Sequence, residues 1–512
     1  MELNWVALTV FILLFGFITW LGFAAAHWRR GDLDQLHEWG LGGRRFGTFI
    51  TWFLLGGDIY AAYTFIAVPA LAFGAGALAF FAVPLHRHHL SDSLHRISAT
   101  MVCIPQARLR HGGRFRPRAL RQSLACTRHH HHRYRGDYAV YRAATRRPSG
   151  SDRRHGRHRE GFAGDIPLII AFVILAAFTY SSGLRAPASI AVVKDLLIYV
   201  TAFAAAIIIP IQLGGFGKIF AAVPPDKLLL AVPHGQTTGA YGTYTTFALG
   251  SAFALLLYPH TMTAILSATS GHTVRRNAAL LPAYTFVLGL LALLGFFALA
   301  DGVDKLPEFA EGFRQYKNNF AVPALFLHNF PSWFVGVAFA AIGIGALVPA
   351  AIMSIAAANL FTRNVYREFF RAHATGKQEA QMAKLDSLIV KFGALIFILF
   401  VPLQYAIQLQ LLGGIWIIQT LPAVLIGLYT RRLNAWALLI GWAAGTFAGT
   451  YMAASVNFAA TYPLAIAGWT FPGYIALYTL ILNLVIAILL TPVMNMLGSK
   501  SEDQTAPADY YA

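Results

Sequence analysis

Residues 47–76 read GTFITWFLLGGDIYAAYTFIAVPALAFGAG, an apolar stretch long enough to cross a bilayer, with Gly-Gly-Asp near its middle. Two adjacent glycines weaken a helix, by about 1 kcal/mol each relative to alanine. An aspartate is costly against lipid, so we expect Asp58 to face the protein interior or a cavity. The stretch predicts a membrane helix interrupted at Gly56 and Gly57. The alternative is a continuous helix whose glycines let a neighbour pack closely, with Asp58 bonded to a buried hydroxyl.

Apolar residues dominate the whole chain and not only this stretch. Of its 512 residues 57% are hydrophobic and 12% are charged, and the mean hydropathy is +0.56. A soluble domain carries about 25% charged residues, so the composition excludes a soluble globular class. Apolar runs of about 20 residues, each able to cross a hydrocarbon core of about 30 Å, predict an all-α polytopic membrane protein. The expected spans lie near residues 5–26, 47–66, from 68 onward, 166–184, 188–210, 241–267, 277–300, 333–360, 387–403, 406–428, 435–453 and 471–496.

A basic block interrupts this pattern at residues 85–160. It holds 18 arginines, no lysine and four acidic residues, which makes +14 of the chain's net charge of +18. It also holds 11 of the 18 histidines, including the run RHHHHRYR at residues 128–135, and both cysteines, Cys103 and Cys126. Three interpretations compete: a cytoplasmic loop for nucleic acid or lipid headgroups, a metal site built on the histidines, and translation in the wrong frame.

The genetic code favours the third interpretation, translation in the wrong frame. Arginine codons (CGN) and histidine codons (CAY), read one base later, become GNN and AYN triplets, which include codons for valine, alanine, glycine, isoleucine and threonine. With synonymous codons chosen freely, residues 129–147 become TIITGIVATMPYIALQLVG, which reads as a membrane helix. We therefore predict that residues 85–160 are out of frame and have no native structure, and that the chain as printed is a non-functional product.

Lysine and arginine mark the cytoplasmic loops of membrane proteins. Basic residues follow the first span and recur at residues 272–277, 361–377 and 429–434. This pattern places the N-terminus outside and a disordered polar tail, residues 497–512, in the cytoplasm. If these basic loops are all cytoplasmic, the chain has to cross the membrane outward once more between the span that starts at residue 68 and the span at 166–184. Residues 85–160 contain no apolar run able to make that crossing. We expect about 13 spans, with part of span 3 and all of span 4 corrupted.

A second apolar run, residues 247–268, contains polar and helix-breaking residues, namely Gly250, Ser251, Pro259 and His260. Proline removes a backbone donor and can leave carbonyls free. A histidine there could relay a proton or meet a carboxylate. The alternative is a kinked helix with an ordinary histidine near its cytoplasmic end.

Two further features favour packing or surface roles. Residues 342–360 are rich in glycine and alanine around Pro349, which suits tight helix contacts. Lys194 and Asp195 lie near the cytoplasmic start of the span at 188–210. A lysine can extend from there to the membrane surface, so a substrate role is the less favoured interpretation.

Four stretches together resemble the sodium:solute symporter family. They are GGRRFGTFITWFLLGGDIYAAYTF (42–65), SSGLRAPASIAVVKDLLIY (181–199), LLYPHTMTAILSATSGHTVRRNAALLPAY (256–284) and ALVPAAIMSIAAANLFTRNVYREF (346–369). The resemblance covers about residues 1–84 and 161–496, and its nearest branch looks like bacterial monocarboxylate permeases for lactate, pyruvate and similar acids. It implies a five-plus-five inverted-repeat fold, spans 2–6 and 7–11, with spans 2 and 7 interrupted around a central site.

The resemblance also implies site residues. Carbonyls of Gly56 and Ile59 would bind a sodium ion. The hydroxyl positions of span 9 fall on Val348 and Pro349, which have no hydroxyl, so Ser354 is the nearby candidate. This departure leaves sodium or a proton as the coupling ion. The expected substrate-binding residues are Gly57, Asp58, Tyr60, Ala252, Phe253, Tyr258 and His260.

We therefore expect a secondary active transporter, with residues 1–496 as its transporter domain, that imports small monocarboxylates by cation symport across a bacterial inner membrane. A sodium-coupled symporter of amino acids or another small solute is the alternative within the family. A membrane-bound sensor would need a soluble signalling domain, and an enzyme would need clustered intramembrane histidines or acids. The expected partners are a small organic acid and the lipid bilayer, with no cofactor, no metal besides the possible sodium, no nucleic acid and no obligate protein partner.

Overall fold

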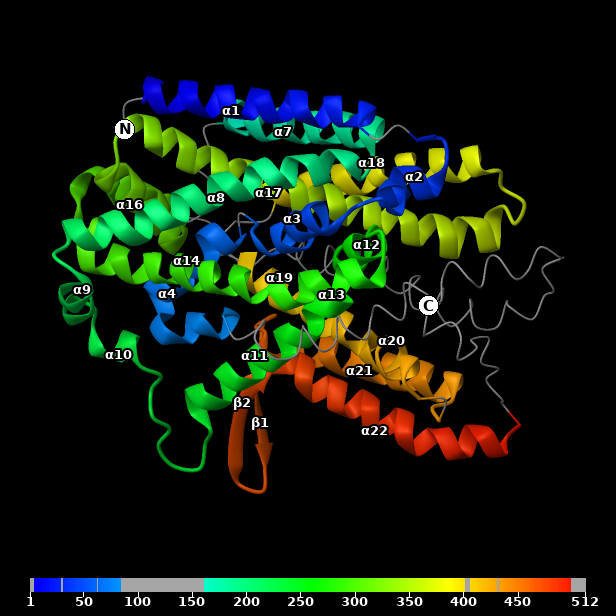
Figure 1. Ribbon diagram of the computed structural model, residues 1–512. Coiled ribbons are helices and arrows are strands. Elements are labelled where there is room, and N and C mark those ends of the chain that lie inside the picture. Colours follow the sequence, from blue (N-terminus) through cyan, green and yellow to red (C-terminus); the bar gives the residue numbers. More distant parts are fainter. Residues whose placement is uncertain are drawn as a thin grey trace.

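The computed structural model describes residues 4–28, 31–61, 63–83, 161–400, 406–430 and 432–498 (Figure 1). The side chains of a few helical residues, Asp58 and Ile59 among them, lie outside this description. The segment predicted to be out of frame, with the damaged third and fourth spans, also lies outside the described residues, as does nearly all of the predicted tail.

Helices make up most of the described chain. The long or membrane-buried ones are α1 (Trp5–Ala24), α3 (Thr48–Ile59), α4 (Val68–Ala75), α7 (Gly161–Ser182), α8 (Arg185–Gln212), α11 (Gly239–Leu257), α12 (Pro259–Leu266), α14 (Pro282–Asp301), α17 (Ser332–Phe361), α18 (Gly376–Phe400), α19 (Ala406–Ile417), α21 (Ala435–Ser455) and α22 (Ile475–Met496). Among the described residues, eight helical segments are long and apolar enough to span a membrane, and two shorter apolar helices accompany them. The predicted helical, polytopic architecture is confirmed.

Short helices connect these segments. They are α2 (Leu36–Leu41), η4 (Gly76–Ala82), α9 (Phe216–Ala222), α10 (Pro225–Leu228), α13 (Gly271–Leu280), α15 (Ala310–Tyr316), α16 (Ala321–Asn329) and α20 (Leu421–Val424), with π-helical turns η3 (Tyr63–Ala67) and η10 (Thr362–Phe370). Residues 301–320, between α14 and α16, therefore contain helical turns of their own.

Helix α17 lies at the centre of the packing, against α1, α8, α12 and α18. Small residues allow this close approach: a Cβ at Gly336 would lie 2.5 Å from the backbone oxygen of Ala7 on α1. Lipid tails are as apolar as leucine, so close van der Waals packing supplies much of the attraction between membrane helices. Within residues 342–360, a Cβ at Gly343 would lie 3.2 Å from the ring of Phe11 on α1, so this part of α17 also packs closely. Helix α17 continues through Pro349.

A β-hairpin is the main element that the sequence did not suggest. Strands β1 (Thr461–Ile466) and β2 (Trp469–Tyr474) pair antiparallel, with Ile466 opposite Trp469. The two turn residues between them, Ala467 and Gly468, both have positive φ, as a tight two-residue hairpin requires. The hairpin lies beside α11 and replaces the first residues of the span expected at 471–496 (Figure 1).

Helix α18 begins eleven residues earlier than the span expected at 387–403, at Gly376. Its added turns are polar and are held by ion pairs: Lys377 and Lys384 lie 3.5 and 3.7 Å from the carboxylate of Asp34, and Arg367 lies 3.2 Å from Glu379. Hydropathy alone marks only the part of a helix inside the membrane, which explains the difference.

Candidate functional site

The first predicted interruption is present, a few residues after the glycine pair. Helix α3 ends at Ile59, Tyr60 is non-helical (φ −90°, ψ 77°), and the chain resumes as the π-helix η3 and then α4. The carbonyl of Gly56 still accepts the backbone N–H of Tyr60 at 3.4 Å. The backbones of Asp58 and Ile59 belong to the last turn of α3, whereas their side chains lie outside the described residues.

The glycine pair allows other side chains to approach the backbone. A Cβ at Gly56 would lie 1.9 Å from the ring of Tyr284 on α14. A Cβ at Gly57 would lie 3.2 Å from the Asp195 carboxylate and from the Lys194 ammonium on α8. Both the close packing and the interruption weighed for this stretch therefore occur, the packing at Gly56 and Gly57 and the interruption at Tyr60.

Lys194 binds the interruption. Its side chain is fully buried, and its Nζ donates to the carbonyls of Gly57 and, at 2.8 Å, of Tyr60. The Nζ also lies 3.2 Å from Oδ1 of Asp195, which is equally buried. The expectation that Lys194 extends to the membrane surface was wrong, because α8 begins at Arg185 and carries the lysine more than two turns inward.

Three tyrosines complete this cluster. The Tyr284 hydroxyl donates to Oδ2 of Asp195 at 3.0 Å, and the Tyr60 hydroxyl donates to the Tyr284 carbonyl at 2.6 Å. The Tyr60 ring lies 4.8 Å from that of Tyr284 and 5.9 Å from that of Tyr199, between ring centroids. Sequence reasoning missed Tyr199 and Tyr284; only the spacing of Asp195 and Tyr199, four residues apart on one helix face, could have suggested a link.

The second predicted interruption lies between α11 and α12, at Tyr258. This residue is extended (φ −62°, ψ 131°) because it precedes Pro259, which disfavours the helical conformation before it. Gly250 and Ser251 do not interrupt the helix: α11 runs through both, and a Cβ at Gly250 would lie 2.4 Å from the ring of Tyr474. Interruptions in spans 2 and 7 are thus confirmed.

The other predicted substrate residues lie on both sides of this second interruption, Ala252 and Phe253 before it and His260 after it. Tyr258 stacks on His260 with ring centroids 5.1 Å apart, and its hydroxyl accepts from Nε2 of Gln410 at 3.2 Å. His260 and Ala252 are buried, and Phe253 is half-buried. Helix α12 of span 7 packs against α3 of span 2, and α17 contacts both helices. The two interrupted spans therefore meet.

The predicted hydroxyl ligand belongs to a separate cluster. Ser354 on α17 is buried, donates to the Ala351 carbonyl at 2.8 Å and accepts from the Ser387 hydroxyl at 3.2 Å. The buried ammonium of Lys391 donates to Ser387 at 2.6 Å. Val348 and Pro349, at the expected ligand positions, are buried within the apolar part of α17.

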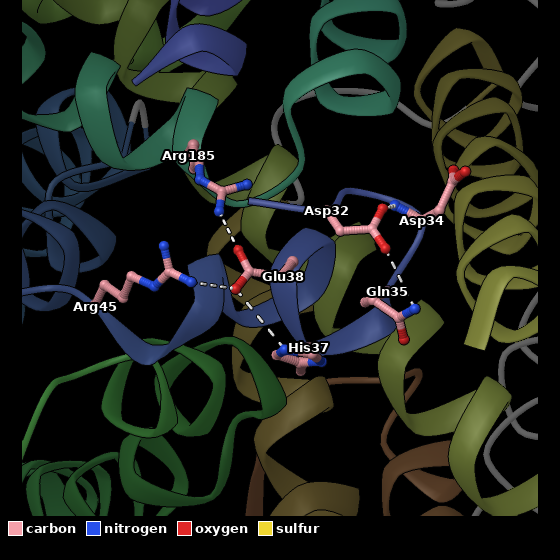
Figure 2. A network of polar contacts seen from close by, with 7 residues as sticks. All are labelled: Asp32, Asp34, Gln35, His37, Glu38, Arg45 and Arg185. Atoms are coloured by element: carbon pink, nitrogen blue, oxygen red, sulfur yellow. Dashed lines mark hydrogen bonds and ion pairs between the residues drawn. The ribbon is translucent and has the colours of Figure 1, made fainter. Parts of the chain in front are cut away.

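A polar network holds the chain just before α3 (Figure 2). Glu38 on α2 is buried and receives two guanidinium groups, from Arg45 at 2.8 Å and from the buried Arg185 at the start of α8. Next to it, Asp32 accepts the amide of Gln35 at 3.3 Å (Figure 2). Glu38 thereby joins the segment leading into α3 to α8, the helix that carries Lys194.

A pocket of about 660 Å³ lies elsewhere, between α11, the hairpin and α22. Its lining is mainly apolar and includes Tyr241, Thr245, Leu464, Phe471 and Tyr478. None of the predicted site residues lines it, so we do not assign the site to this pocket.

Interrupted membrane helices that meet buried charges inside an apolar bundle are characteristic of membrane transporters. The comparisons with known proteins specify which kind. The chain belongs to the sodium:solute symporter family, whose sequence profile matches residues 161–445.

Relatives support this assignment over nearly the whole chain. A "Monocarboxylate transport permease protein" of Rhizobium johnstonii is 42% identical over 506 residues, covering 96% of this chain and 98% of the relative. The "Uncharacterized symporter YodF" of Bacillus subtilis is 27% identical over 464 residues, 87% of each chain. The structure of a Na+-coupled sialic acid symporter superposes with a TM-score of 0.67 at 15% identity, covering 96% and 98% of the two chains. This likeness shows the five-plus-five inverted-repeat transporter fold.

Proposed function

We propose that this protein is a secondary active transporter that imports small monocarboxylates, such as lactate and pyruvate, by cation symport through alternating access. The observation that carries the proposal is the interruption of span 2 against the buried Lys194–Asp195 pair. Broken helices near the bilayer midplane are where transporters of this architecture bind ions and substrates. The 42% identical relative named as a monocarboxylate transport permease supports the substrate class.

The substrate space of the proposal lies between the two interruptions. On the span 2 side it includes Gly57, Asp58 and Tyr60. The span 7 side contributes an apolar face, Ala252 and Phe253, followed by Tyr258 and His260. An apolar face with few polar groups suits a small acid that carries a methyl group. The contact between α3 and α12 supports this placement.

Sodium and a proton are the two candidate coupling ions. Membership of the sodium:solute symporter family and the Na+-coupled structural neighbour support sodium, with Gly56, Ile59 and Ser354 as its proposed ligands. Two observations favour a proton instead: Val348 and Pro349 have no hydroxyl, and Lys194 already binds the carbonyls of Gly57 and Tyr60. We further propose that transport needs no organic cofactor.

The remaining proposals concern the polypeptide as a whole. Residues 1–496 form one transporter domain in a bacterial inner membrane, with the N-terminus outside and the tail, residues 497–512, in the cytoplasm. Residues 85–160 are read out of frame. The basic loops support the orientation, and the codon argument supports the frame.

Uptake by cells tests the proposed substrate class. Cells that express the chain with residues 85–160 restored to the alternative frame should accumulate radiolabelled lactate or pyruvate above vector controls. Unlabelled monocarboxylates should compete, and neutral amino acids should not. Competition by amino acids without competition by monocarboxylates would instead identify an amino-acid symporter of the same family, the second candidate.

A further inference from the structure

The ammonium of Lys194 lies among three oxygens at the span 2 interruption. A lysine ammonium has three N–H donors. This one donates hydrogen bonds to the carbonyl of Gly57 and, at 2.8 Å, to the carbonyl of Tyr60. Oδ1 of Asp195 lies 3.2 Å away as its ion-pair partner, without a hydrogen bond to it. Backbone carbonyls and a carboxylate are also the ligands that bind hard metal cations in proteins.

Among the side chains that the structure describes here, the charges around this ammonium are balanced. Lys194 and Asp195 are both fully buried and form one ion pair. The second carboxylate oxygen of Asp195 accepts the Tyr284 hydroxyl at 3.0 Å. A sodium ion on the same carbonyls would lie beside the ammonium, and like charges at that distance repel strongly away from water.

The facing helix adds no oxygen from its side chains at the matching positions. Val348 and Pro349 on α17 are buried and lack hydroxyls, and the Ser354 hydroxyl is bonded to Ala351 and Ser387. Within the described part of the chain, the oxygens available to a cation at this position are therefore the carbonyls of Gly57 and Tyr60 and the Asp195 carboxylate.

We propose that the Lys194 ammonium is the resident cation of the span 2 interruption and that it occupies the position in which a metal ion would bind. Sodium does not bind at these carbonyls while Lys194 is present. The inference rests on the proposed function in one respect, because it specifies which cation the proposed transport site holds.

Sodium binding to purified protein tests this directly. Two full-length parents are used, the printed chain and the chain with residues 85–160 restored to the alternative frame. Each parent is compared with its Lys194→Met and Lys194→Arg variants by the binding of radioactive sodium, without any organic acid. Lys391→Met is the matched control, because Lys391 is also a buried membrane lysine but donates its hydrogen bond to the Ser387 hydroxyl. Thermal unfolding in sodium chloride against choline chloride gives a second readout.

Lys194→Met should bind one more sodium ion per chain than the parent and gain a sodium-specific rise in Tm of about 2 °C or more. The parent, Lys194→Arg and Lys391→Met should show no such gain. Sodium binding in Lys194→Met that equals or falls below that of the parent would overturn the proposal. So would a parent whose bound sodium disappears in Asp195→Asn.

The double variant Lys194→Met/Asp195→Asn covers the case in which the single variant does not fold. If Lys194→Met folds only when sodium is present during purification, the proposal is supported. If it fails in both salts while the double variant folds, the vacated oxygens do not accept sodium and the proposal is wrong. None of these readouts needs transport, so missing monocarboxylate uptake would contradict the proposed function and leave this result unaffected.

Discussion

The hydroxyl of Tyr284 on α14 lies 3.0 Å from the carboxylate of Asp195 on α8, and this hydrogen bond connects two membrane helices at a buried charge. Through Asp195 it also reaches Lys194, which binds the carbonyls of the span 2 interruption. Three separate spans therefore meet at one ion pair. Any rearrangement of span 2 during transport has to carry this pair with it or release it.

Tyr284→Phe should destabilise the protein without changing its packing. The variant keeps the ring and removes a hydrogen bond to a buried carboxylate, which costs about 1.5–3 kcal/mol. A fall in Tm of several degrees should follow in detergent-solubilised protein. The control is Tyr451→Phe, at a largely exposed position on α21, which should leave Tm unchanged. Equal Tm values for both variants would show that the Tyr284 hydroxyl contributes nothing to stability.

Gly56→Ala should displace α14 from α3. The added methyl group would lie 1.9 Å from the ring of Tyr284, so the ring or the helix has to move. Overpacking of this kind costs about 1–3 kcal/mol, and uptake should fall with it. Gly16→Ala on α1 is the matched control, since its Cβ meets no atom within 4 Å and alanine favours a helix. If both variants behave alike in Tm and uptake, Gly56 has no packing role.

Asp58→Asn in the frame-restored protein should reduce cation-dependent uptake strongly while membrane expression persists. The change keeps the shape of the side chain and removes its charge, and an ionisable residue in a membrane span is by default a functional candidate. Initial uptake rates at varied cation concentration give the measurement, with expression quantified in the same membranes. Unchanged kinetics and cation dependence would reduce Asp58 to a packing role.

Monocarboxylate uptake by the frame-restored protein should persist when sodium is replaced by choline and should collapse when an uncoupler removes the proton gradient. The reason is the incomplete sodium shell: Lys194 binds the carbonyls of Gly57 and Tyr60, and Val348 and Pro349 provide no hydroxyl. The measurement is uptake in matched buffers, with the uncoupler and sodium varied independently. Uptake that requires sodium and ignores the proton gradient would contradict this expectation.

The chain as printed should insert poorly and transport nothing. Residues 85–160 hold 18 arginines, each of which opposes insertion by about 2.5–3.5 kcal/mol at a helix centre. Sequencing of the encoding DNA across codons 84–161, followed by uptake assays on both frames, gives the measurement. Robust uptake by the printed chain would show that the basic block is a native part of the protein.

Local pattern was sufficient for the larger features of this fold. Runs of apolar residues placed the described spans, because the length needed to cross a hydrocarbon core is a property of each segment alone. Pro259 located the interruption of span 7, since proline constrains the residue before it wherever it occurs. The glycine pair located the interruption of span 2 to within a few residues.

Contacts across the chain decided what those features do. The sequence placed Lys194 at a span start and suggested a surface role, yet its partners come from span 2 and its exposure is zero. The Tyr284 contact with Gly56 likewise joins helices that are distant in sequence. Hydropathy and helix breaking are properties of neighbouring residues, so the sequence by itself determined the class, the spans and the interruptions. The environment of a buried charge depends on which helices pack around it, and only the tertiary structure decided that.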